Sequence, residues 1–278
     1  MKITFGLVVY NEEKNIRRCL ESIKDVADEI VVVHDGECKD NTLKICGEYT
    51  DKIFVREHLG GSDPHRLFIL KQARNDWIFI IDADEFLSEE LKLFLADPDI
   101  GEKCAGVAFK WPYWDGKKYG GSSNYRVCLM NRNKCWAISL HNFPIRVLGP
   151  VCKVDCLLEH RPEENRLSLS HAWSDKIKKR IPRDANRFLL GFDNLEKYNP
   201  GLIDEKFKNW FSSYLAHPLY YAFLNLFKYF LGSYKNVYKD GVSGLIISLQ
   251  QSLYQFKLAL TIWKIKRNGK KVGTFSGI

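Results

Sequence analysis

The chain has 278 residues, of which 45% are hydrophobic and 27% charged, and it carries a formal net charge of +8. This composition fits an ordinary globular protein and excludes a low-complexity one, and the length allows one large domain or one domain with a substantial appendage. The charge is unevenly placed, since residues 1–160 carry a net −3 and residues 161–278 a net +11, which favours an anionic partner for the C-terminal part.

Short apolar runs alternate with helical patterns over the first hundred residues. Four of these runs predict buried strands, at residues 3–9, 29–34, 52–55 and 77–81. Helices are predicted between the strands and from Ser88 onward, with Asn11 and Ser88 as N-caps. This alternation implies an α/β fold with a mostly parallel, Rossmann-like sheet that is flanked by helices.

The chain changes character after residue 104. Residues 107–111 and 125–130 predict two further strands, and the aromatic, glycine-rich stretch between them predicts a long hairpin or loop. From about residue 174 the pattern is helical, with helical segments at residues 176–198, 210–234 and 242–265. We therefore expect a first domain at residues 1–173 and a helical C-terminal region at residues 174–278.

The C-terminal helical segments are rich in aromatic and basic residues. No stretch in them reaches 18 consecutive apolar residues, so a transmembrane span is not predicted. Two alternatives remain open, which are helices that lie on a membrane surface and a helical hairpin that packs on the domain or on a second subunit of a homo-oligomer. No recognised nucleic-acid-binding module accompanies the positive charge, so a nucleic-acid partner is not expected.

The cysteines and the N-terminus indicate the compartment. Eight cysteines are scattered without a C-x-x-C pair, which in a chain of this length is neither a disulfide framework nor a zinc site. We expect most of them to be thiols in a reducing compartment. Met1 and Lys2 lead directly into an apolar segment without the features of a signal peptide, which predicts a cytoplasmic protein, peripheral on the inner face of the membrane if its helices bind lipid.

Polar side chains follow three of the predicted strands. They are Tyr10-Asn11 after the first strand, His34-Asp35 after the second and Asp82-Ala83-Asp84 after the fourth. Parallel sheets bind ligands at the carboxyl ends of their strands, so we expect the three clusters to lie at one edge. Because residues two apart on a strand point to the same side, the two aspartates converge there, and two convergent carboxylates suit an Mg²⁺ ion that also binds substrate phosphates.

These motifs, taken in order, carry a family resemblance. They read Tyr10-Asn11-Glu12-Glu13, then His34-Asp35-Gly36 followed by Asp40-Asn41-Thr42, then Asp82-Ala83-Asp84-Glu85. The set resembles the inverting glycosyltransferases of family 2, which have the GT-A fold and use nucleotide sugars. Residues 238–245 are similar to a segment of the glucosyltransferases of the bacterial lipopolysaccharide inner core. The resemblance is specific over residues 1–95, weaker over residues 96–175 and moderate over residues 235–265.

The resemblance implies an activity and a set of binding residues. It implies a metal-dependent transfer of a sugar from a nucleotide sugar, in the first place a UDP-sugar, to a saccharide or lipid-linked saccharide during cell-surface glycan synthesis. The implied nucleotide-binding residues are Tyr10, Asn11, Glu12, Asp35, Arg66 and Asp82. Of these, Tyr10 is expected to stack near uracil, Asp35 to accept a hydrogen bond from the base, and Arg66 to lie near phosphate. The implied ligands of Mn²⁺ or Mg²⁺ are Asp82, Asp84 and His160.

The general base departs from the family pattern. Inversion requires a group that takes the proton of the acceptor hydroxyl, and the resembling subgroup commonly has a His-Glu pair where this chain has His141-Asn142. An asparagine cannot serve as a base at neutral pH. The candidates left open are Glu159, Asp155, His141 and Asp115.

Two other functions are compatible with parts of the sequence. A catalytically inactive, nucleotide-sugar-binding relative is favoured by the missing carboxylate at Asn142. A nucleotidyltransferase would need a glycine-rich phosphate loop after the first strand, and residues 10–13 contain no glycine. The aromatic residues of the predicted hairpin are expected either to stack on acceptor sugars or to form a small core of their own, and they are Trp111, Tyr113, Trp114 and Tyr119.

Overall fold

The computed structural model of the chain describes most of residues 1–162 and the C-terminal helices. The described residues are 1–58, 62–96, 104–114, 117, 119–120, 124–137, 145–162, 180–182, 184–185, 189, 205–238 and 241–268. The chain divides into two compact units, of which the first comprises Met1–Trp111 with Tyr125–Glu163 and the second Pro112–Asn124 with Glu164–Ile278. The domain boundary predicted at residue 173 lies outside the described residues and stays a prediction.

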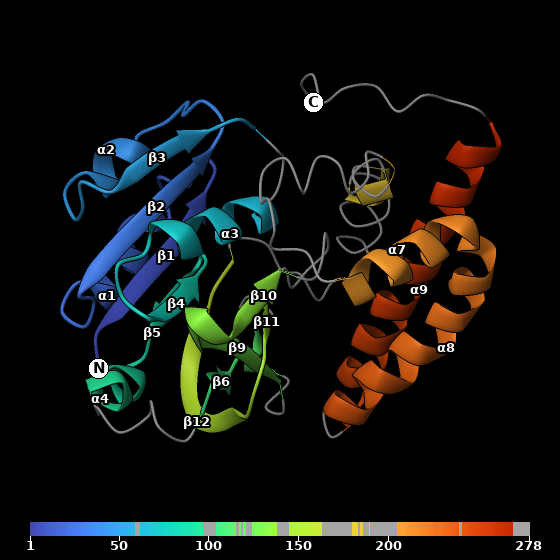
Figure 1. Cartoon of the computed structure of the whole chain (residues 1–278). Helices are drawn as coiled ribbons and strands as arrows, with labels where there is room; N and C mark the ends of the chain where they lie inside the picture. The colour runs from blue at the N-terminus through green and yellow to red at the C-terminus, as the bar shows by residue number, and fades with distance from the viewer. Residues whose placement is uncertain are drawn as a thin grey trace. The chain divides into compact units, whose positions relative to one another are not determined.

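The first unit is built around one sheet. Over the described residues this sheet has eight strands in the order β3-β2-β1-β4-β9-β6-β12-β5 (Figure 1). They are β1 (Ile3–Val9), β2 (Glu29–Asp35), β3 (Ile53–Arg56), β4 (Trp77–Ile81), β5 (Glu85–Leu87), β6 (Gly106–Lys110), β9 (Tyr125–Asn131) and β12 (Val151–His160). β1 is parallel to both β2 and β4, β3 is parallel to β2 and β12 to β6, whereas β9 runs antiparallel to β4 and β6. The predicted α/β fold with a mostly parallel sheet is therefore confirmed.

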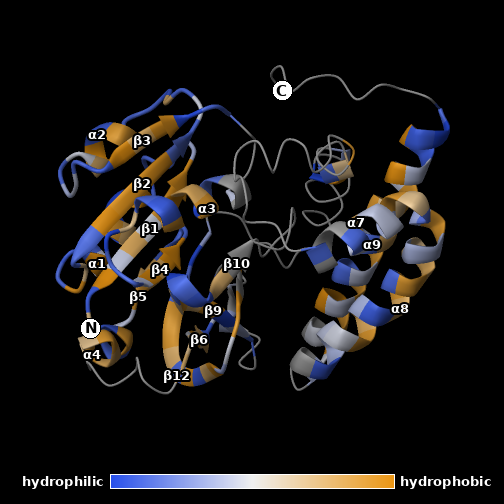
Figure 2. Ribbon diagram, viewed as in Figure 1, coloured by the Kyte–Doolittle hydropathy of each residue, from blue (hydrophilic) through white to orange (hydrophobic). Residues whose placement is uncertain are grey.

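Helices cover both faces of the parallel strands. Within the described part of this unit they are α1 (Ile16–Ile23), α2 (Thr42–Cys46), α3 (Asp63–Gln72) and α4 (Glu89–Ala96). Phe5 and Phe79 stack within a core to which α1, α2 and α4 contribute, while Ile69 of α3 packs with Val31 and Ile78 on the other face. Because both faces are covered, β4 is apolar along its whole length and β2 along its middle, as the hydropathy colours show (Figure 2).

Gly6 allows α3 to lie close to the middle of β1. A Cβ atom at this position would lie 2.4 Å from Cγ2 of Ile69, which is closer than two carbon atoms can approach. The absent side chain thus sets the distance between helix and sheet. It thereby fixes the position of Arg66, which α3 carries toward the carboxyl end of the strands.

The predicted caps have different outcomes. Ser88 caps α4, since its Oγ accepts a hydrogen bond from the N–H of Leu91 at 3.2 Å. The prediction for Asn11 is wrong, because α1 begins at Ile16 and Asn15 occupies its N-cap position. Asn11 instead adopts a left-handed backbone with φ 52°, and its Oδ1 accepts from the N–H of Lys39 at 2.8 Å. It joins the loops that follow β1 and β2.

One pair of cysteines departs from the expected thiols. Cys104 and Cys152 form a disulfide with their Cα atoms 5.8 Å apart, because the pairing of β12 with β6 brings together residues 48 positions apart in the sequence. Sequence spacing cannot show this pairing. The other six cysteines, all of which lie in the described part of the chain, are free.

Smaller pieces complete the two units. In the first unit β10 (Cys135–Ala137) pairs with β11 (Ile145–Val147), and a 3-10 turn at Arg132–Lys134 precedes them. In the second unit β7 (Tyr113–Trp114) and β8 (Tyr119–Gly120) form the antiparallel pair of the predicted hairpin.

The described helices of the second unit are long. They are α7 (Glu205–Ala216), α8 (Pro218–Val237) and α9 (Val242–Arg267). Pro218 begins α8 and separates it from α7, since proline lacks the N–H that a continuous helix needs. α8 and α9 pack as an antiparallel pair. Most of the predicted helix at residues 176–198 lies outside the described residues. Among the helices that are described, none has the length and apolar character needed to cross a bilayer.

Candidate nucleotide-sugar site

The carboxyl ends of β1 and β2 bring the first two polar clusters together. The Asn11 N–H lies 3.4 Å from Nε2 of His34, and the Glu12 N–H donates to Oγ1 of Thr42 at 2.6 Å. His34 is buried and its Nδ1 lies 2.8 Å from the carbonyl oxygen of Gly36. Since a carbonyl only accepts, Nδ1 carries the proton and Nε2 accepts from Asn11. The loop after β1 is thereby held against the end of β2.

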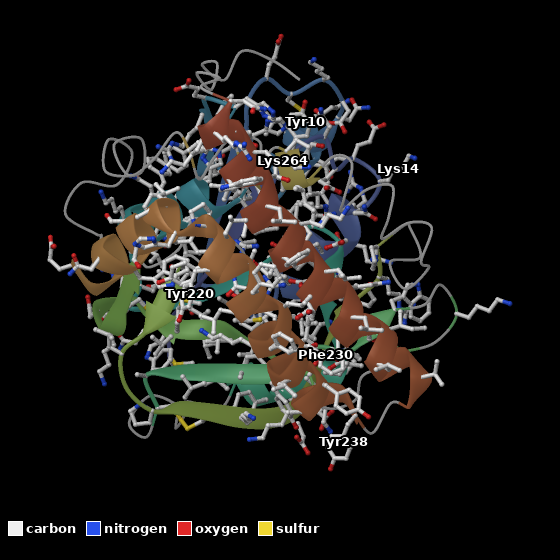
Figure 3. The ribbon with its side chains drawn as sticks, turned by 90° about the vertical axis from the view of Figure 1, so that its right-hand side faces the viewer. Tyr10, Lys14, Tyr220, Phe230, Tyr238 and Lys264 are labelled. Carbon is white, nitrogen blue, oxygen red and sulfur yellow. A yellow bond between two sulfur atoms is a disulfide. The ribbon has the colours of Figure 1, made fainter. Side chains whose placement is uncertain are left out.

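Tyr10 forms the exposed edge of this region. Its side chain is 44% exposed and its ring lies 4.9 Å from the ring of His58 (Figure 3). Gly36 makes room for His58, because Gly36 has φ +100° and a Cβ there would lie 2.8 Å from Cβ of His58. The ring of Tyr10, which is predicted to stack on a base, is thus packed against the ring of His58. The exposed face of Tyr10 can stack on the base of a nucleotide.

Asp35 is a nearly buried carboxylate that accepts from histidine. Nε2 of His65 lies 2.8 Å from Oδ1 of Asp35, and Arg56 lies 3.3 Å from Nδ1 of the same ring. An arginine only donates, so Nδ1 of His65 accepts and Nε2 carries the proton toward Asp35. His58 approaches Oδ2 of Asp35 at 3.4 Å. Sequence reasoning assigned a role to Asp35 but missed both histidines. His58 lies in the loop after β3 and His65 in α3, and neither belongs to a local motif.

Asp82, after β4, is bound by two arginines. Nη2 of Arg66 donates to its Oδ1 at 2.6 Å, and Nη2 of Arg126 lies 3.2 Å from its Oδ2. Burial opposes ionisation of Asp82, but the charges of Arg126 and Arg66 outweigh it and hold the pKa of this carboxyl well below its usual range. Asp82 therefore serves here to position two cations at the strand ends.

Glu85 is a second buried carboxylate in the same cluster. It accepts from Nη1 of Arg126, from the indole N–H of Trp111 at 2.6 Å, and from the N–H of Asp82 at 2.9 Å. Complete burial raises the pKa of Glu85 above its usual value, Arg126 opposes this rise, and the charge of Asp82 adds to it. Sequence reasoning missed Arg126, although an arginine inside the apolar run of β9 was a usable signal.

Asp84 and His160 lie side by side beyond this cluster. β12 pairs with β5 so that His160 is opposite Glu85, and Nε2 of His160 lies 3.3 Å from Oδ2 of Asp84. The imidazole also stacks on Trp111 with ring centroids 4.5 Å apart. The structure thus brings together two of the three predicted metal ligands, while Asp82 faces the arginines.

The donor set around Asp84 fits a divalent ion that is shared with a diphosphate. Over the residues that the structure describes, no three His, Cys, Asp or Glu side chains converge as a complete metal site. One carboxylate oxygen and one imidazole nitrogen are ligands that Mn²⁺ accepts, and its other positions can be filled by phosphate oxygens and water. Asp84 and His160 match that pattern.

The predicted general bases lie in different surroundings. Asp155 accepts from the hydroxyl of Tyr125 and lies 3.3 Å from Nζ of Lys110, and these two partners lower its pKa. Glu159 accepts from Arg161 at 2.7 Å. His141 and Asp115 lie outside the described residues. Nothing in the described geometry selects one base, so all four stay predictions.

Glu12 is predicted to bind the nucleotide. In the structure its carboxylate accepts a hydrogen bond from the side chain of Asn15 at 3.1 Å.

Several curated sequences with detectable similarity are named as glycosyltransferases. An uncharacterised glycosyltransferase of Rickettsia typhi is 38% identical over 91 residues, which are 33% of this chain and 30% of that protein. The prophage-derived glycosyltransferase SunS of Bacillus subtilis is 38% identical over 92 residues, which are 32% of this chain and 22% of that protein. The matched stretch thus spans less than a third of either relative.

Solved structures show a distant likeness. Residues 1–349 of S. aureus TarS in complex with UDP superpose with a TM-score of 0.45 at 16% identity, over 97% of this chain and 92% of that one. Glucosyl-3-phosphoglycerate synthase from Mycobacterium tuberculosis, in complex with Mg²⁺ and UDP, gives a TM-score of 0.41 at 15% identity, over 59% of this chain and 72% of that one.

The family model described as Glycosyl transferase family 2 matches residues 4–151. This segment is more than half of the chain. It begins in β1 and extends to the start of β12, so it contains Tyr10, Asp35, Arg66, Asp82 and Asp84. The chain belongs to glycosyltransferase family 2.

Proposed function

We propose that this protein transfers a sugar from a nucleoside diphosphate donor, a UDP-sugar in the first instance, to a hydroxyl group of a saccharide or lipid-linked saccharide, with inversion at the anomeric carbon. The observation that carries the proposal is the cluster at the strand ends of the family domain. There Asp84 and His160 lie 3.3 Å apart, and Arg66 and Arg126 both bind Asp82, two residues before Asp84. The likeness of residues 238–245 to lipopolysaccharide inner-core enzymes supports a cell-surface glycan as the acceptor.

The base and the diphosphate of the donor would bind to different side chains. The base would stack on Tyr10, and its imide N–H would be accepted by Asp35. Asp84 and His160 would hold Mn²⁺ or Mg²⁺, which when bound neutralises charge on the diphosphate leaving group. Arg66, which Asp82 orients, would bind a phosphate oxygen through the rest of its guanidinium fork.

The acceptor half of the reaction needs a base. The acceptor hydroxyl attacks from the face opposite the departing diphosphate, and the transition state at the sugar is expected to be oxocarbenium-like, as in glycoside hydrolysis. A group that removes the hydroxyl proton typically contributes about 10²–10⁴ in rate. We retain Glu159, Asp155, His141 and Asp115 as candidates for this role.

The test is release of UDP from a panel of UDP-sugars with Mn²⁺ and a crude glycan acceptor. Asp84→Asn keeps the shape of the side chain but removes its charge, and we expect turnover to fall by roughly 10²–10³-fold. Glu89→Gln is the matched control, because Glu89 is an exposed acid at the start of α4, and it should retain full turnover. Equal turnover of Asp84→Asn and the wild type would refute the assigned role.

The inactive alternative predicts a different combination of results. A protein that binds nucleotide sugars without transferring them would show a rise in Tm with UDP-sugar, because a ligand of the folded state stabilises it, but no release of UDP with any acceptor. Asn142 in place of the usual glutamate favours this reading. Measurement of both Tm and turnover on one preparation separates the two functions.

A further inference from the structure

α8 exposes a row of large apolar side chains along one side. Tyr220, Phe227 and Leu231 are 64%, 66% and 63% exposed, and they recur at spacings that place residues on one face of a helix. On the opposite side of the helix Ala222 and Asn225 are buried. The row consists of Tyr220, Phe223, Leu224, Phe227, Leu231 and Tyr234, with Tyr238 directly after the helix. Tyr220 and Tyr238, at the two ends of the row, are labelled in Figure 3.

α9 carries a second exposed row beside the first. Its members are Val242, Leu245, Leu249 and Leu253, whereas Ile247, Tyr254 and Leu258 on the other side of the helix are buried. The rings of Phe223 and Phe256 meet edge to face with centroids 5.7 Å apart. This contact joins the two rows, which together form what we call the α8–α9 apolar face. A continuous apolar surface of this kind is rare on a soluble monomer unless it binds something.

The charge on the same two helices is of one sign. Neither α8 nor α9 contains an aspartate or a glutamate. Lys228 and Lys235 are exposed and each follows a residue of the α8 row by four positions, Leu224 and Leu231. The basic residues of the two helices are Lys228, Lys235, Lys257, Lys264, Lys266 and Arg267.

We propose that the α8–α9 apolar face docks on the surface of an anionic lipid membrane. The two helices would lie in the plane of the interface, with the apolar rows at the boundary between headgroups and acyl chains. The lysines, whose methylene stems can follow apolar surface, would reach the lipid phosphates. The tyrosines suit the same depth, because each combines an apolar ring with a polar hydroxyl. The proposal goes beyond the proposed sugar transfer and does not rest on it.

A second copy of the chain fits this face less well. In a two-fold symmetric dimer the same patch faces itself, so lysines would face lysines with no acidic residue on either helix to pair with them. A nucleic acid would satisfy the lysines but would leave Leu231, Leu249 and Leu253 against water and phosphate. An anionic membrane satisfies both the charge and the apolar surface.

The experiment is co-sedimentation of the full chain with vesicles. We expect binding to phosphatidylcholine vesicles that contain about a third phosphatidylglycerol, much weaker binding to pure phosphatidylcholine, and a loss of affinity as salt is raised from about 0.1 M to 1 M. Phe227→Ser/Leu231→Ser should weaken binding roughly 100-fold or more, since two large side chains no longer enter the interface. Lys228→Gln/Lys235→Gln should weaken it about 30-fold, and only on the anionic vesicles.

Matched controls lie in the first unit. Leu93→Ser removes a leucine that is 77% exposed on α4, and Lys44→Gln/Lys134→Gln removes two exposed lysines. Both controls should bind vesicles as the wild type does. Far-UV circular dichroism checks that each variant is folded, and the lysine pair tests the proposal even if the apolar pair fails to fold.

Three outcomes would overturn the proposal. The first is no binding to anionic vesicles. The second is vesicle binding that neither Phe227→Ser/Leu231→Ser nor Lys228→Gln/Lys235→Gln weakens. The third is a dimer in sedimentation velocity that Phe227→Ser/Leu231→Ser dissociates, which would make a second copy the occupant. Because none of these readouts measures UDP release, failure here leaves the proposed transfer reaction untouched, and the reverse also holds.

Discussion

Arg126 places one cation between the partly exposed carboxylate of Asp82 and the buried carboxylate of Glu85, and this arrangement makes the strand-end cluster sensitive to a single substitution. Its side chain is 11% exposed and it contacts both Asp82 and Glu85. The two charges raise the pKa of Arg126 in spite of its burial. Removal of one partner from a buried ionic group leaves charge uncompensated, which typically costs about 3–5 kcal/mol.

We expect Arg126→Gln to lower the free energy of unfolding by about 3 kcal/mol, since Asp82 still keeps Arg66 while the buried Glu85 loses the arginine that pairs with it. Urea denaturation at neutral pH measures this. Arg17→Gln is the control, because Arg17 pairs with Glu48 on an exposed surface and such pairs contribute about 0–1 kcal/mol. If Arg126→Gln and Arg17→Gln lowered the free energy of unfolding equally, the pairing of Arg126 with Glu85 would contribute no more to stability than an exposed ion pair.

The residues of the site differ in how far the sequence could identify them. Asp82 and Asp84 stand in a short motif after an apolar strand, so their place at the sheet edge could be predicted. His65 could not, because it contacts Asp35 only after α3 has packed on the sheet. Arg126 stands out as a charged residue inside an apolar run, but its contact with Asp82 forms only once β9 has paired with β4. The pairing of Asp82 with two arginines is likewise a property of the packed cluster.

At the scale of elements, the contact between α3 and β1 depends on Gly6. An added Cβ would press on Ile69 inside a covered core, so we expect Gly6→Ala to lower the free energy of unfolding by about 2 kcal/mol through overpacking. In an Ile69→Ala background the same substitution should cost much less, because only the tight contact with Cδ1 of Ile80 at 3.1 Å remains, and a double-mutant cycle would report the difference as coupling. Gly232→Ala, at an open position on α8, should instead stabilise by about 0.5–1 kcal/mol. Additive losses at Gly6 and Ile69 would contradict the packing argument.

The elements that the sequence predicted best are those whose pattern is complete within one short segment. β1, β2 and β4 each contain a continuous or nearly continuous apolar run and lie where they were expected. The three residues of β5 carry no period of their own and exist as a strand only because β12 pairs with them. The start of α1 was placed too early at Asn11, since its left-handed backbone serves the link to Lys39 rather than a helix.

At the scale of the whole molecule, the two compact units are proposed to have different ligands. The strand-end cluster lies in the unit that contains residues 1–111, and the α8–α9 apolar face lies in the unit that contains residues 164–278. Chains built from more than one compact unit often unfold in more than one step. A ligand that binds one folded unit stabilises that unit by mass action, by about 2.7 kcal/mol at a hundred times its Kd.

We therefore expect calorimetry of the full chain to show two transitions that respond separately. UDP with Mn²⁺ should raise one Tm by roughly 5–10 °C, and anionic vesicles should raise the other. Asp84→Asn should abolish only the first shift, and Lys228→Gln/Lys235→Gln should reduce only the second, so each variant is the control for the other. A single transition that both ligands move together would contradict this assignment, because it would mean that the two units unfold as one and that neither shift can be attributed to its own site.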